Sequence, residues 1–157
     1  MKESKAHHSK SSPWAVLFLA WLIFSCAWLL IFSLPPVINH VILEFKLTHG
    51  QAGLLIGLPP LMLAFFAVLG GLLCDSLGYL RTASMAATLM CLAGILRAFS
   101  QDFLQLFSLT MLMGIGIALL IPNLPKIVKQ TFPPDKVDIA TGIYVTGACV
   151  GASIALA

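Results

Sequence analysis

Long apolar stretches, separated by short polar segments, dominate this sequence. Five of them are long enough to approach or exceed the roughly 20 residues that a bilayer-spanning helix needs. They cover residues 14–38, 52–73, 82–99, 103–125 and 139–157. The stretches are solidly apolar rather than alternating every second residue, which disfavours barrel strands. Because lipid offers no hydrogen-bond partners to the backbone, the pattern predicts helices, and so an all-α polytopic membrane protein.

Composition supports this assignment and excludes other classes of protein. The 157 residues are 59% hydrophobic and only 10% charged, whereas a soluble domain carries roughly 25% charged residues. A soluble enzyme domain, a disordered chain, a nucleic-acid binder and a disulfide scaffold are all excluded. The four cysteines lie in or beside apolar stretches without metal-ligand spacing, so we expect neither a metal site nor a cofactor.

The basic residues are unevenly distributed between the two sides of the predicted bundle. Seven of the nine lie on one side, and only Lys46 and Arg97 lie on the other. The seven are Lys2, Lys5, Lys10, Arg81, Lys126, Lys129 and Lys136. Cytoplasmic segments carry the excess of Lys and Arg. We therefore expect a cytoplasmic basic tail at residues 1–13, a transmembrane domain at residues 14–157 and a plasma (inner) membrane location, without a nucleic-acid partner.

Local signals indicate where the first two spans meet. Pro35-Pro36 is expected to bend or end the first span. Thr48 followed three residues later by Gln51 is the pattern of a capping box, which marks the start of the second span. Asp102 is placed to cap the fourth span.

Small residues recur at spacings that allow helices to approach closely. The glycines concerned are Gly53 and Gly57, Gly114 and Gly116, and Gly147 and Gly151. Such spacing allows two helix backbones to come into contact. Each pair predicts either a tight interhelical seam, a sliding surface in a conformational cycle, or simple packing.

The segment between the second and third spans combines glycines with charged residues. Gly71 allows close packing at the end of the second span, and Gly78 allows the chain to reverse. Asp75 places a carboxylate at the membrane surface, where a charge is costly unless it is paired or aimed at a helix amino terminus. Arg81 is a cytoplasmic anchor and a candidate ion-pair partner of Asp75.

This segment resembles the signature loop of the major facilitator superfamily. That loop lies between the second and third helices on the cytoplasmic side, where the basic residues also place it. Gly71, Asp75 and Gly78 stand at the matching positions, and Arg81 is the one basic residue retained. The resemblance implies that Gly71, Asp75, Gly78 and Arg81 form a gating loop.

A second resemblance covers most of the remaining chain. Residues 114–118, 122–133 and 140–144, with residues 47–59, are similar to members of the cyanate-permease and nitrate/nitrite-porter group. Residues 14–38 and 52–73 contain no Arg or Lys, so an inorganic anion is not indicated as the substrate.

The resemblance implies a fold and a mechanism. Family members have twelve helices in two halves that rock about a central substrate site. The five spans would then belong to the amino-terminal six-helix half, and we expect the chain to be incomplete. The expected function is secondary active transport by alternating access. Its implied partners are a small-molecule substrate, the lipid bilayer and a missing carboxy-terminal half, with a coupling ion left open.

Four polar or aromatic residues are candidates for the substrate pathway. Ser25, Trp28 and Ser33 lie near helical spacing in the first span, and Asn123 lies between two prolines in the fourth. Packing of Trp28 and a simple helix break at Asn123 are the alternatives. Lys126 and Lys129 are expected to anchor to anionic lipid.

A different class of function also fits the sequence. The alternative is a small membrane structural or assembly protein that acts through its glycine seams without transport. An enzyme is not expected, because the spans contain no intramembrane His or Glu and no paired Asp.

Overall fold

A computed structural model describes residues 12–157, and every regular element within them is a helix. The elements are α1 (Pro13–Phe32), η1 (Pro35–Val37), α2 (Ile38–Phe45), α3 (His49–Leu77), α4 (Tyr79–Arg97), α5 (Phe103–Leu120), α6 (Asn123–Thr131), η2 (Pro134–Lys136) and α7 (Val137–Leu156). The expected tail lysines Lys2, Lys5 and Lys10 lie outside the described residues.

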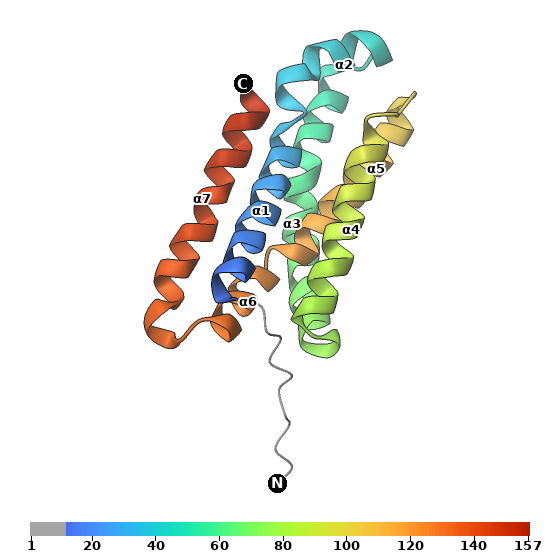
Figure 1. Ribbon diagram of the computed structural model, residues 1–157. Helices are drawn as coiled ribbons and strands as arrows, with labels where there is room; N and C mark the ends of the chain where they lie inside the picture. Colours follow the sequence, from blue (N-terminus) through green and yellow to red (C-terminus); the bar gives the residue numbers. More distant parts are fainter. Residues whose placement is uncertain (1–11) are drawn as a thin grey trace.

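Five helical units are long and apolar enough to cross a membrane, which confirms the predicted all-α polytopic fold. They are Pro13–Phe45, His49–Leu77, Tyr79–Arg97, Phe103–Thr131 and Pro134–Leu156. The units run up and down in a bundle, with α2 at one end and α6 at the other (Figure 1). We call these the α2 end and the α6 end.

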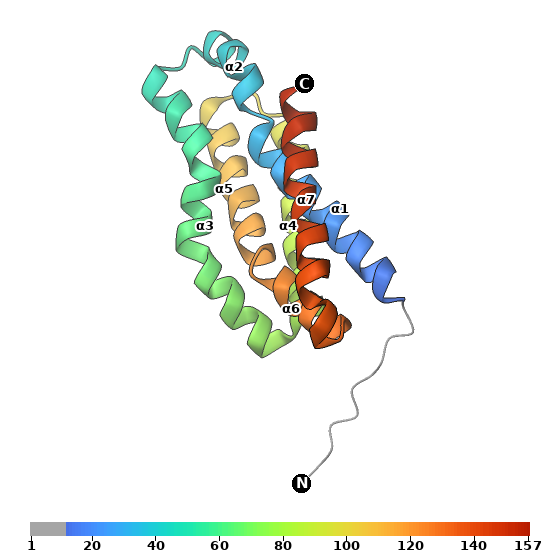
Figure 2. The same cartoon turned by 90° about the vertical axis from the view of Figure 1, so that its left-hand side faces the viewer.

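The first unit bends where the sequence predicts a disturbance. α1 ends at Phe32, and Pro35 and Pro36 begin a short 3-10 turn. The chain then continues as α2, which leans away from α1 across the α2 end of the bundle (Figure 2). Proline cannot donate a backbone hydrogen bond, so the helical ladder cannot continue unchanged here.

The predicted capping signals are present. The hydroxyl of Thr48 accepts a hydrogen bond from the backbone of Gln51, and the Gln51 side chain accepts one from the backbone of Thr48. Asp102 likewise accepts from the backbone N–H of Gln105 at 2.7 Å. These caps satisfy amide groups that the first turn of a helix leaves unpaired.

The helices pack in two groups, α1 with α7 and α5 with α3 and α4. Contacts of α1 and α6 connect the two groups. α1 lies along α7, while α5 lies against both α3 and α4 (Figure 1). A Cβ atom at Gly114 would lie 3.0 Å from Met62 on α3, and one at Gly116 would lie 2.8 Å from the backbone of Met90 on α4. The two glycines therefore allow α5 to sit close to both neighbours.

The α1–α7 seam is closer still. A Cβ atom at Gly147 would lie 2.7 Å from the Ser25 hydroxyl, and one at Gly151 would overlap the Ser25 carbonyl oxygen. Across the same seam, the indole of Trp21 donates to the Thr146 hydroxyl at 3.1 Å. This seam is held by direct backbone contact, which only glycine permits at these positions.

Gly53 and Gly57 are placed differently. They lie on an exposed face of α3, and a Cβ atom at either would meet no atom within 4 Å. Their spacing predicts a seam, but no other helix of residues 12–157 packs against these two glycines.

Candidate functional site

The loop between α3 and α4 is reduced to a single residue. Gly78 adopts φ of 88°, a left-handed conformation that L side chains rarely take. Thr82 holds the turn from the α4 side, because its hydroxyl lies 3.2 Å from the Leu73 carbonyl and 3.0 Å from the Gly78 carbonyl. The predicted segment is thus two helix ends joined by one glycine.

Asp75 forms an ion pair with a residue far away in the sequence. Lys126 Nζ lies 2.7 Å from Asp75 Oδ1, and it also donates to the Gly71 carbonyl at 3.3 Å. The Lys126 side chain is 36% exposed and that of Asp75 is 71% exposed. The second carboxylate oxygen of Asp75 therefore stays open to a further partner.

This pairing differs from the sequence-based expectation. Arg81 was a candidate partner of Asp75, but within residues 12–157 the only ion pair is that of Asp75 with Lys126. Lys126, for which lipid anchoring stays a prediction, ties α6 to the end of α3. One signal in the sequence indicates this contact: the distribution of basic residues places Lys126 and the segment that contains Asp75 on the same side of the membrane.

A break in the fourth unit brings Lys126 to Asp75. α5 ends at Leu120, and α6 begins again at Asn123 after Pro122. Asn123 is fully buried, and its Nδ2 donates to the Leu119 carbonyl at 2.5 Å. The side chain thereby satisfies a carbonyl three residues before the proline, where the helical ladder is interrupted.

Two of the four pathway candidates carry buried polar atoms without a partner. Within residues 12–157 these atoms are Trp28 Nε1 and Asn123 Oδ1. Trp28 lies between Phe24, at 6.1 Å between ring centroids, and Phe32, at 5.8 Å. A buried polar atom left unpaired costs roughly 1–3 kcal/mol, so these two atoms call for an explanation.

The other two candidates are engaged elsewhere. The Ser25 hydroxyl donates to the Trp21 carbonyl at 2.9 Å and lies in the α1–α7 seam. The Ser33 hydroxyl donates to the Leu30 carbonyl at 2.8 Å and accepts a hydrogen bond from Arg97. The structure therefore does not bring the four residues together around one cavity.

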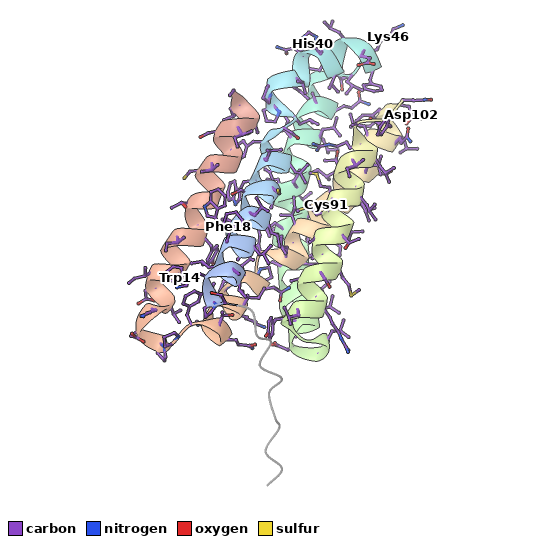
Figure 3. The ribbon with its side chains drawn as sticks, in the orientation of Figure 1. Trp14, Phe18, His40, Lys46, Cys91 and Asp102 are labelled. Atoms are coloured by element: carbon purple, nitrogen blue, oxygen red, sulfur yellow. The ribbon has the colours of Figure 1, made fainter. Side chains whose placement is uncertain are left out.

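Several polar residues lie at the α2 end. Figure 3 shows His40, Lys46 and Asp102 at this end, far from Trp14 and Phe18 on the opposite half of α1. Within the described part of the chain, no three His, Cys, Asp or Glu residues are grouped so that they could hold a metal ion.

The sequence matches the family model of the Major Facilitator Superfamily over residues 14–157. The chain belongs to this superfamily. The helical bundle agrees with this assignment. It superposes on the crystal structure of a bacterial homologue of the human lysosomal transporter Spinster with a TM-score of 0.87 and 25% identity, over 94% of this chain and 31% of that one.

Curated relatives within the superfamily are named as transporters. An uncharacterized transporter, YycB of Bacillus subtilis, is 31% identical over 95% of this chain. The nitrate/nitrite transporter NrtP of Picosynechococcus is 30% identical over 87% of it. A 2-nitroimidazole transporter of Escherichia coli is 33% identical over 77%.

The chain spans only part of these relatives. It covers 37% of the length of YycB, 25% of NrtP and 30% of the 2-nitroimidazole transporter. The chain is thus an integral membrane member of a transporter superfamily, and it spans between a quarter and about a third of the length of these three relatives.

Proposed function

We propose that the chain is the amino-terminal part of a secondary active transporter that moves a small solute by alternating access. The Asp75–Lys126 pair is the observation that carries this proposal. It links the α3–α4 junction to α6 at one end of the bundle and leaves one Asp75 oxygen available. The family resemblance assigns that carboxylate to a contact with a helix end in the missing carboxy-terminal half.

The proposed orientation places the α6 end in the cytoplasm. Arg81, Lys126, Lys129 and Lys136 belong to elements at this end, and Lys46 and Arg97 to those at the α2 end (Figure 1). An excess of basic residues marks the cytoplasmic side. The tail before α1 would then be cytoplasmic, and the membrane would be the plasma (inner) membrane.

In this mechanism Asp75 favours the state that is closed toward the cytoplasm. Asp75→Asn in the complete protein should shift the resting population toward the cytoplasm-open state, because the amide carries no charge for Lys126 or a facing helix amino terminus. Single cysteines at Leu43 and Gln130, which are exposed on α2 and α6, would report labelling at each end. Labelling at Gln130 should rise in the variant.

Asp135→Asn is the matched control for this experiment. Asp135 is exposed near the same end and has no ion-pair partner within the described residues. Equal labelling in wild type, Asp75→Asn and Asp135→Asn would contradict a gating role for Asp75.

The 157 residues expressed alone should give no saturable uptake in proteoliposomes, since they would form less than one half of the pathway.

Trp28 and Asn123 are the proposed contacts with the solute. Their unpaired Nε1 and Oδ1 atoms would supply one donor and one acceptor to a polar solute as it passes along the pathway. Trp28→Phe keeps the aromatic packing and removes only the N–H. In the complete protein it should weaken transport without lowering expression, whereas unchanged transport would assign Trp28 to packing alone.

A further inference from the structure

A cavity of about 410 Å³ lies at the α2 end, opposite the Asp75–Lys126 pair. It is open to the outside and is lined by the end of α1, by η1 and α2, by the end of α4 and by the start of α5. Its apolar walls are Leu30, Leu34, Val37, Val41, Phe45 and Leu106, and its polar groups are Ser33, Glu44, Arg97 and Ser100. Sites for small organic molecules commonly have volumes of 300–1,000 Å³.

Arg97 is the cation of this cavity, and it forms no ion pair with an acidic residue of the described range 12–157. Its Nη2 donates to the Ser33 hydroxyl and, at 3.4 Å, to the Leu30 carbonyl. A guanidinium has five N–H donors. Those of Nε and Nη1 make no hydrogen bond to residues 12–157, since both hydrogen bonds of Arg97 come from Nη2. Arg97 is the last residue of its span, a position from which an arginine can reach carbonyls, water or a charged ligand at the membrane surface.

Glu44 is the one acid that lines the cavity, and it does not neutralise Arg97. It is exposed on α2, and it makes no ion pair with Arg97 in the described structure. The cavity therefore offers a fixed positive charge with free donors, beside a hydroxyl and several aliphatic and aromatic walls. The Nε and Nη1 donors point to different sides of the guanidinium, and each can give a charge-assisted hydrogen bond to a carboxylate oxygen.

We propose that this cavity binds a small organic carboxylate, with Arg97 holding the carboxylate and the apolar walls holding its hydrocarbon part. Calling this ligand the transported solute, met as it enters from the α2 end, rests on the proposed transport function. The binding itself does not, so an experiment that measures occupancy separates the failure of one proposal from the failure of the other.

The test is protection of Arg97 from phenylglyoxal, an arginine reagent, in the complete protein held in phosphatidylcholine nanodiscs. Benzoate is the probe, and benzyl alcohol is its uncharged counterpart. Peptide mass spectrometry reads Arg97 and Arg81, the only two arginines in these 157 residues, and Arg81 lies at the opposite end. Benzoate should protect Arg97 saturably and leave Arg81 unchanged, while benzyl alcohol should protect neither.

Substitutions in the cavity sharpen the test. Val41→Phe should fill the cavity without removing an Arg97 contact and should abolish protection, whereas Leu43→Phe, at an exposed position of the same helix, should preserve it. Arg97→Gln should raise the dissociation constant of radiolabelled benzoate roughly tenfold or more, since hydrogen bonds to charged groups are among the strongest. Arg97→Lys should lose less.

Four results would overturn the proposal. One is equal protection by benzoate and benzyl alcohol, and another is no protection by benzoate. The third concerns other occupants of the cavity. If phosphatidylglycerol alone protects Arg97 and benzoate adds nothing, a lipid headgroup fills the site. A sharp rise in unliganded Arg97 reactivity in Glu44→Gln would likewise show that Glu44 is its partner.

Discussion

Two pairs of glycines share one spacing and have opposite surroundings. Gly147 and Gly151 on α7 press against the backbone of α1, whereas Gly53 and Gly57 on α3 face open space. The difference lies in the partner, because α1 presents the small Ser25 where the helices cross. Two glycines four residues apart therefore mark a helix face that another helix can approach closely. The residues of the neighbouring helix decide whether that approach takes place.

The largest effect is expected at Gly151. Gly151→Ala should destabilise the 157-residue chain by about 2–3 kcal/mol, because its Cβ overlaps the Ser25 carbonyl and the helices must move apart. Unfolding in mixed detergent micelles, followed by circular dichroism, measures this change. A variant as stable as wild type would mean that α1 and α7 are not in backbone contact.

A smaller loss is expected one helical turn away. Gly147→Ala should cost about 1–2 kcal/mol, because the Ser25 hydroxyl can rotate away and the nearest backbone atom, the Trp21 carbonyl oxygen, lies 2.8 Å from the new Cβ rather than overlapping it. The same unfolding experiment applies. A loss larger than that of Gly151→Ala would reverse the order of closeness along the seam.

The opposite sign is expected on α3. Gly57→Ala should stabilise the 157-residue chain by about 0.5–1 kcal/mol, since alanine loses less backbone freedom in a helix and its Cβ meets no atom within 4 Å. The complete protein provides the contrast. If its additional helices cover this face, the same substitution should destabilise it, and stabilisation in both proteins would leave the face open to lipid.

The smallest effect concerns the hydrogen bond across the closed seam. Trp21→Phe removes the donor to the Thr146 hydroxyl and should cost about 0.6 kcal/mol, a typical value for interhelical hydrogen bonds in membranes. Thr146→Val, combined with Trp21→Phe, tests whether the two changes are additive. Full additivity would show that this hydrogen bond contributes nothing.

Much of the fold could be predicted from local chemistry. Apolar length gave the five spanning units, Thr48 and Gln51 gave the start of α3, and Gly78 gave the reversal into α4. Each of these signals acts through neighbouring residues, so the sequence contains both partners in one short window.

The candidate site was less predictable, because its contacts join distant segments. The partner of Asp75 is Lys126, 51 residues later, and it reaches Asp75 only because the chain breaks at Pro122. The sequence indicated a disturbed backbone there without giving the direction of α6. In the same way, spacing along α1 grouped Ser25 with Trp28, although Ser25 lies in the seam with α7.

The single-glycine connection between α3 and α4 has a mechanical consequence. Only Gly78 lies between the two long helices, so the junction has no loop that could move by itself. A change at this point must alter the angle between α3 and α4. A spectroscopic label placed there would report the tilt of α3 and α4 as whole helices rather than the motion of a loop.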